Sequence, residues 1–148
     1  MIAPLTDIKT RKVWMGALAR AKAPELARLF TDLPAHIVLR APEVGAAMLR
    51  GRIGGSGQPF NLGEMTVTRC SVRLGSGTVG HAHVQGRDKA HALRAAVLDA
   101  LLQSDPDGAL YAQVIAPLLQ AEAAAYALRA AKAAATKVEF FTLVRGED

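Results

Sequence analysis

The chain has 148 residues, of which 51% are hydrophobic and only 5% aromatic, and a formal net charge of +5 at pH 7. This length is typical of one domain with a single core, so we expect residues 1–148 to form one domain whose core is thin in large side chains. The single cysteine, Cys70, excludes an internal disulfide, and no apolar run is long enough for a signal peptide or a membrane span, which predicts a cytoplasmic protein without a membrane partner.

Two helices are predicted at the start of the chain. Residues 9–21 have helical spacing of their apolar side chains, with Trp14 and Leu18 on one face. Pro24 is suited to the first turn of a second, shorter helix, which should end before Pro34.

The middle of the chain predicts strands separated by glycine-rich turns, at residues 37–39, 46–53, 64–74 and 78–84. A break at residues 42–45 separates the first two strands. GGSG at residues 54–57 predicts a hairpin connection, because no lysine–serine helix start follows it as a phosphate-binding P-loop requires. The apolar alternation in residues 64–74 changes phase, which predicts a β-bulge near Arg69. An antiparallel meander follows from this pattern.

After residue 84 the spacing of apolar residues changes from that of a strand to that of a helix. Gly86 permits a sharp turn after the strand at residues 78–84, and Asp88 is a good N-cap for a helix. Apolar spacing then predicts an amphipathic helix whose outer face carries Lys89, Arg94 and Asp99.

The C-terminal third predicts a loop at residues 104–108, an extended segment at 109–115, a helix at 122–136 and a final strand at 137–145. The last strand has no polar face, so it should be covered by this chain or by another. The predicted fold class is therefore α+β, an antiparallel β meander with N-terminal helices and two longer helices packed on it.

Positive charge concentrates between residues 40 and 94, where eight cations occur with three acids. A basic centre suits a phosphate-bearing ligand, nucleic acid or an acidic protein partner, although compositional bias alone also produces arginines. The turn after residue 84 can present free backbone N–H groups beside two cations and so hold an anion; the alternative is a capped helix with two solvated cations. The candidate substrate- or partner-binding residues are Gln85, Arg87, Asp88, Lys89, His91, Arg52, Arg69 and Arg145.

Neither a metal site nor a catalytic site is identified. His81 and His83 share one side of a predicted strand and His91 follows on the helix, but no carboxylate or cysteine has companion spacing, so no metal is predicted. Cys70 lies within a predicted strand, and there is no Gly-x-Ser-x-Gly motif or carboxylate pair, so the catalytic residues stay unassigned.

Four runs carry a family resemblance: RIGGSG at 52–57, GEMTVTRCSVRL at 63–74, GHAHVQGRDKAHALRAAVLDALLQ at 80–103 and VEFFTLVRGED at 138–148. Together they resemble the PhnG family, the small G subunit of the bacterial carbon–phosphorus (C–P) lyase system for phosphonate use. The order and spacing agree from about Trp14 onward. The chain departs at His81 and His83, where we expect aromatic or small residues in relatives.

The resemblance implies a subunit of a cytoplasmic core complex with the H, I and J subunits. That complex displaces adenine from MgATP with a phosphonate, giving ribose 1-phosphonate 5-triphosphate, and the nucleosidase chemistry is associated with the I subunit. It follows that this chain supports a transferase complex, is inactive alone and holds no cofactor, while the iron–sulfur cluster and SAM belong to the J subunit.

Two further expectations concern partners. The alanine-rich core and the apolar tail around Phe140 and Phe141 predict that the isolated chain self-associates or is poorly soluble. The alternative function is a free-standing basic nucleic-acid-binding domain. No basic helix with interleaved aromatic residues supports it, so we expect no nucleic-acid partner.

Overall fold

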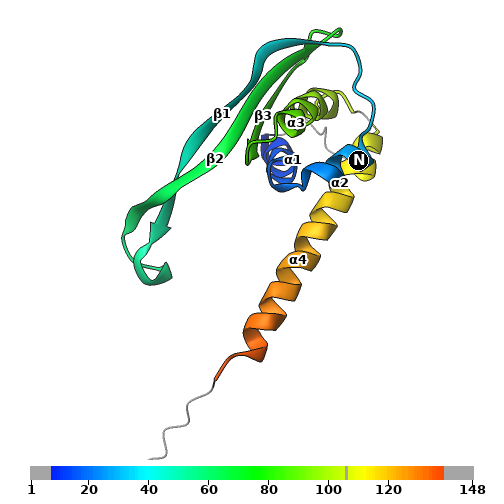
Figure 1. The fold of residues 1–148 in the computed structure, drawn as a ribbon. Helices are drawn as coiled ribbons and strands as arrows, with labels where there is room; N and C mark the ends of the chain where they lie inside the picture. The colour runs from blue at the N-terminus through cyan, green and yellow to red at the C-terminus, as the bar shows by residue number, and fades with distance from the viewer. Residues whose placement is uncertain (1–7, 106, 139–148) are drawn as a thin grey trace, which may run out of the picture.

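The computed structural model describes residues 8–105 and 107–138. Within these ranges the chain forms helices and an antiparallel sheet in the order α1 (Ile8–Arg20), α2 (Ala23–Leu29), β1 (His36–Arg52), β2 (Pro59–Leu74), β3 (Val79–Gln85), α3 (Lys89–Leu102) and α4 (Ala116–Ala135) (Figure 1). A short 3-10 turn, Ile53–Gly55, joins β1 to β2, and a π-helical turn, Tyr111–Ile115, precedes α4. The predicted α+β class is confirmed.

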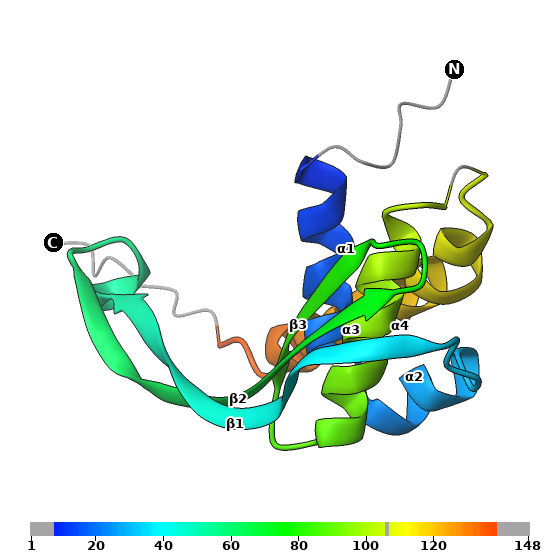
Figure 2. The same cartoon turned by 90° about the horizontal axis from the view of Figure 1, so that it is seen from above.

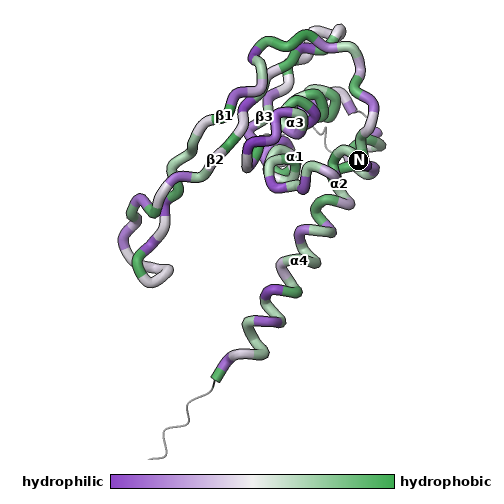
Figure 3. The backbone as a smooth tube through the Cα atoms, viewed as in Figure 1, coloured by the Kyte–Doolittle hydropathy of each residue, from purple (hydrophilic) through white to green (hydrophobic). Residues whose placement is uncertain are grey.

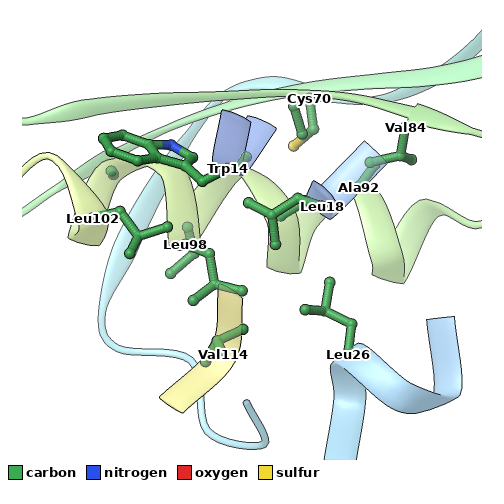
Figure 4. Close-up of a cluster of buried hydrophobic side chains, with 14 of the residues drawn as sticks. Trp14, Leu18, Leu26, Cys70, Val84, Ala92, Leu98, Leu102 and Val114 are labelled. Carbon is green, nitrogen blue, oxygen red and sulfur yellow. The ribbon is translucent and has the colours of Figure 1, made fainter. Parts of the chain in front are cut away.

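The sheet has three strands in the order β1-β2-β3, and α3 lies across one of its faces with α1 beside β3 (Figure 2). One hydrophobic cluster fills the space between these layers. Trp14 and Leu18 of α1, Leu26 of α2 and Leu98 of α3 are its large buried side chains, and Figure 4 shows them between the sheet and the helices. The face of α1 that the apolar spacing predicted is therefore the face that is buried.

Small residues let α3 approach the sheet closely. Ala92, Ala96 and Ala100 of α3 are fully buried, and Gly80 of β3 lies directly against Ala96 and Ala100. A Cβ atom at Gly80 would overlap the carbonyl oxygen of Ala96 and lie 2.6 Å from the backbone nitrogen of Ala100. The core thus depends on backbone contact as well as on large side chains, as the alanine-rich composition predicted.

The first strand corrects two predictions. The expected break at residues 42–45 does not divide it, because β1 runs unbroken from His36 to Arg52 with register shifts between Val38 and Arg40 and between Arg40 and Glu43. The bulge predicted near Arg69 in β2 is wrong as well. Strand β2 is central and its pairing with β3 is continuous, so the extra residues are accommodated in the edge strand β1.

The change of apolar phase within β2 has a different cause. Cys70, Val72 and Leu74 face the core, whereas Val67 lies on the opposite face of the sheet and is nevertheless 3% exposed. Residues 67–73 of β2 therefore use both faces in turn without a bulge.

A two-stranded hairpin extends beyond the core. Strand β3 pairs with β2 only from Val67 to Arg73, so residues 46–66 of β1 and β2 project past it as a separate arm, which we call the hairpin arm (Figure 1). The GGSG segment forms its tip, as predicted. Figure 3 shows polar and apolar residues mixed along the arm, and its exposed large apolar residues are Met48, Leu49, Ile53, Phe60 and Leu62.

The C-terminal region is helical earlier than predicted. Residues 109–115, expected to be extended, form a helical turn that continues directly into α4, whose predicted start at residue 122 is instead Ala116. Pro117 does not interrupt the helix, because it occupies the first turn, where its missing N–H is not needed. Val114, Ile115 and Leu118 are buried against the N-terminal helices, and this tertiary contact fixes the start of α4.

Of the two longer helices, only α3 packs on the sheet. Helix α4 leaves the core after Leu118 and projects away from it (Figure 1). Its exposed large apolar side chains are Tyr126 and Leu128. In the predicted final strand, Lys137 and Val138 are not in a strand, and residues 139–145 lie outside the described residues. None of the helices in the described ranges has the length and apolarity to cross a membrane.

Asp99 is the largest correction to the helix predictions. It was expected on the outer face of α3, but it is fully buried. Its carboxylate accepts hydrogen bonds from the Arg11 guanidinium (2.7 and 3.1 Å), the Trp14 indole (2.9 Å) and the backbone N–H of His81 (2.9 Å). The hydrogen bonds from the Arg11 guanidinium to the Asp99 carboxylate raise the pKa of Arg11. Residues 95–100 of α3 are all buried, so no outer face exists there for Asp99 to occupy.

Candidate functional site

The turn between β3 and α3 is held firmly on both sides. Gly86 has a φ of 88°, which favours glycine, and its N–H donates to the carbonyl oxygen of Thr66 at 2.9 Å. The Thr68 hydroxyl donates to the carbonyl oxygen of Gly86 at 2.7 Å. Both polar groups of the Gly86 backbone are thereby fixed to β2, and the turn follows β3 as a rigid junction, as predicted.

Asp88 caps α3 as predicted. Its Oδ1 atom accepts a hydrogen bond of 2.8 Å from the backbone N–H of His91. We expect Asp88→Ala to lower the free energy of unfolding by about 1 kcal/mol, because one N–H at the helix start loses its acceptor. Urea denaturation of the isolated chain measures this change. Asp88→Asn keeps an acceptor oxygen and should unfold close to wild type; equal losses in both variants would contradict the cap.

The remaining side chains of the turn are available to a ligand or a partner. Gln85, Arg87 and Lys89 are exposed, and none of them has a side-chain hydrogen bond or ion pair within the described part of the chain. Arg87 stands between two fixed neighbours, Gly86 and Asp88. That this turn binds an anion stays a prediction.

A cleft of about 330 Å³ lies beside the turn and includes Gln85 in its wall. Residues from α1, α2 and the first turns of α4 form the rest of it: Ala17, Arg20, Ala21, Lys22, Glu25, Leu118, Ala121, Glu122, Ala125 and Arg129. Lys22 and Arg129 have no ion-pair partner among the described residues. Sequence reasoning did not identify them, since only tertiary packing brings them near Gln85.

One ion pair crosses this cleft. The Arg20 guanidinium donates to both carboxylate oxygens of Glu122, at 2.6 and 3.1 Å, and these hydrogen bonds lower the pKa of Glu122. A lowered pKa means that the pair stabilises the fold above the unfolded-state pKa of Glu122 and stops doing so as pH falls through the folded-state value. Both side chains are more than a third exposed, so the contribution is at most about 1 kcal/mol.

The other candidates lie elsewhere. His91 is buried, and its Nε2 is 2.8 Å from the carbonyl oxygen of Leu18, which makes it a core residue. Arg52 is at the tip of the hairpin arm, where it donates to the carbonyl oxygen of Gly57 at 3.1 Å. Arg145 lies outside the described residues.

Arg69 lies on the face of β2 opposite the core residues Cys70 and Val72. Its Nε atom is buried without a hydrogen-bond acceptor, and its guanidinium lies over Gly45, where a Cβ atom would come within 3.3 Å of Nη2. Glu43, its cross-strand neighbour, forms its ion pair with Arg40. The structure therefore joins Gln85, Arg87, Asp88 and Lys89 in one turn and leaves the other candidates apart from it.

The histidines do not converge. His81 and His83 are exposed on β3, with Nδ1 of His81 2.8 Å from the Ser71 hydroxyl, whereas His91 faces the core. Among the described residues there is no group of three or more histidine, cysteine, aspartate or glutamate side chains able to hold a metal. Burial raises the pKa of the Cys70 thiol, which makes it a poor nucleophile.

Comparison with known proteins gives two findings. The family model described as "Phosphonate metabolism protein PhnG" matches residues 9–146. A relative from Rhizobium meliloti (strain 1021), named alpha-D-ribose 1-methylphosphonate 5-triphosphate synthase subunit PhnG, is 47% identical over an alignment of 148 positions, and the alignment covers 95% of this chain and 92% of the relative. The family match includes the turn, the hairpin arm and α4.

Proposed function

The chain belongs to the PhnG family of phosphonate metabolism proteins, and we propose that it is a subunit of a C–P lyase core complex in organic phosphonate catabolism. In this role it supports transfer of a phosphonate to the ribose C1 of ATP with loss of adenine. The observation that carries the proposal is the 47% identity, over 95% of this chain, to a relative named as a subunit of ribose 1-methylphosphonate 5-triphosphate synthase.

The described surface supports a role in assembly. The hairpin arm and α4 both project from the core and expose large apolar side chains, from Met48 to Leu62 on the arm and at Tyr126 and Leu128 on the helix. Exposed apolar surface of this kind marks sites of protein contact. The proposed partners are the H, I and J subunits, in the cytoplasm. The proposal assigns MgATP to the assembled complex as substrate, the iron–sulfur cluster and SAM to the J subunit, and no cofactor to this chain.

Co-expression with the H, I and J subunits, followed by size-exclusion chromatography, tests the proposal. We expect this chain to elute with all three partners in one high-mass species. The isolated chain should show no ATP-dependent turnover of a phosphonate, because the sequence contains no recognisable catalytic motif. Separate elution of this chain, or turnover by the isolated chain, would contradict the proposal.

A shortened variant makes the assembly test specific. Replacing residues 48–64 with Asn-Gly joins Ala47 to Met65, a hydrogen-bonded pair across the hairpin, by a favoured two-residue turn. The core of the sheet is untouched, so the variant should fold and yet fail to join the complex. Normal assembly of this variant would exclude the hairpin arm as a partner contact.

The nucleic-acid alternative makes a different prediction. A nucleic-acid-binding domain would retain DNA or RNA without partner chains and lose affinity steeply as salt is added, because binding releases counterions. Gel-shift titrations of the isolated chain at two salt concentrations distinguish the two functions.

A further inference from the structure

Strand β3 is an edge strand whose backbone groups alternate between β2 and the open side. The Leu74 N–H donates to the Thr78 carbonyl oxygen, and the Gly86 N–H donates to the Thr66 carbonyl oxygen, so even-numbered residues direct their backbone groups toward β2. The odd-numbered residues, Val79, His81 and His83, therefore direct theirs to the free edge.

Side chains bind one backbone group of each residue in the first half of this edge. Gln103 donates to the Val79 carbonyl oxygen at 2.9 Å, and the His81 N–H donates to Asp99 at 2.9 Å. Beyond that point the edge is open. The N–H and C=O of His83 have no hydrogen-bond partner in the described ranges. Proteins usually blunt or cover an unpaired strand edge, so an edge partly bonded in one half and open in the other needs an explanation.

A second cleft of about 330 Å³ runs along this part of the edge, and we call it the edge cleft. One wall is formed by four consecutive residues of β3, which point alternately to the two faces, so the cleft follows the edge of the strand and not a face of the sheet. The other wall is mainly one face of α1, where Gly16 and Ala19 leave room. The residues of the edge cleft are Lys12, Met15, Gly16, Leu18, Ala19, Arg20, His81, Ala82, His83, Val84 and Ala95.

The shape and chemistry of the edge cleft indicate one kind of occupant. A backbone donor and a backbone acceptor on one residue, beside a narrow cleft, match the backbone of an extended peptide. The lining includes the cations Lys12 and Arg20 and no carboxylate. Arg20 is paired with Glu122, whereas Lys12 has no ion-pair partner among the described residues. Acidic residues therefore suit the segment that enters.

We propose that an acidic, extended segment of a partner subunit adds to β3 as a fourth strand in the edge cleft, forming two backbone hydrogen bonds with His83. This inference rests on the proposed function, because it requires that the chain assembles with partner subunits. Beyond the proposed function, it identifies the surface of this chain that the partner uses, the backbone hydrogen bonds that form there and the chemistry of the partner segment.

A pair of substitutions at one residue tests the backbone bonds. His83→Pro removes the N–H that faces the free edge without removing a hydrogen bond to β2, and proline is tolerated on edge strands. His83→Ala removes the imidazole and keeps the N–H. In the co-expressed complex we expect His83→Pro to weaken binding of this chain about tenfold, the value of one lost hydrogen bond, and His83→Ala to bind like wild type.

Ala19→Leu is a second test that leaves the strand intact. It fills the edge cleft from the α1 side and should weaken assembly in the same way. Ala112→Leu, at an exposed position outside the cleft, is its matched control and should assemble normally. Thermal unfolding of each isolated variant verifies that it folds. The comparison of Ala19→Leu with Ala112→Leu therefore tests whether a partner segment occupies the edge cleft, even if His83→Pro does not fold.

Hydrogen–deuterium exchange tests directly whether the His83 N–H forms a hydrogen bond in the complex. The His83 amide should exchange fast in the isolated chain at low and at high concentration, and at least tenfold more slowly in the complex. Assembly without protection at His83, together with equal binding of the proline and alanine variants, would overturn strand addition while leaving the proposed function intact. Protection that appears in the isolated chain at high concentration would identify a second copy as the occupant and likewise overturn the proposal. If wild type does not assemble at all, the proposed function fails first.

Discussion

Asp99→Ala is expected to lower the free energy of unfolding by about 3 kcal/mol or more, the largest loss that we predict for a single side chain of this protein. The carboxylate is fully buried and accepts hydrogen bonds from Arg11, Trp14 and the backbone of His81. Alanine leaves the Trp14 indole N–H without an acceptor in the core and removes the partner of the Arg11 guanidinium. Urea denaturation of the isolated chain measures the change.

Two further variants distinguish the stability that the buried hydrogen-bond network around Asp99 contributes from the general effect of removing a carboxylate. Asp32→Ala removes an exposed carboxylate that has no partner in the described ranges, and it should change stability by less than about 0.5 kcal/mol. Asp99→Asn keeps the volume and one acceptor oxygen, so its loss should lie between those of the two alanine variants. An Asp99→Ala protein as stable as Asp32→Ala would show that the buried network contributes little.

Arg87→Ala is expected to abolish growth on a phosphonate as sole phosphorus source while leaving the melting temperature nearly unchanged. The side chain is exposed and has no partner within the chain, so its removal costs little stability. Its position is fixed, because Gly86 is bonded to β2 and Asp88 caps α3. A guanidinium held in this way can pair with a triphosphate or phosphonate oxygen, or with a carboxylate of a neighbouring subunit.

The growth test uses a phosphonate-utilising strain that lacks its own copy of this subunit. Arg28→Ala is the matched control, since Arg28 is also exposed and unpaired in the described structure but lies on α2, and it should support normal growth. Arg87→Lys keeps the charge and loses the bidentate geometry, so partial growth would indicate paired hydrogen bonds to an oxyanion. An Arg87→Ala complex that assembles and supports normal growth would show that Arg87 is only a solvated cation.

The sequence by itself determined the features that depend on neighbouring residues. Gly86 and Asp88 specify the turn and the start of α3 because a positive φ and an N-cap are local requirements. The alternation and the glycine-rich turns likewise specified the antiparallel meander, and helical spacing specified the buried face of α1. The family resemblance was also readable, because it is carried by continuous motifs such as VQGRDK.

Tertiary structure decided what depends on residues far apart in the chain. Asp99 is charged, so its place in α3 indicated solvent exposure, and only the approach of α1 and β3 supplies the donors that allow its burial. The start of α4 is set by contacts of Val114 and Ile115 with the N-terminal helices, which outweigh the local preference of residues 109–115 for extended structure. The edge cleft exists only because α1 lies beside β3. This contact cannot be read from residue spacing, since α2, β1 and β2 separate the two elements in the chain.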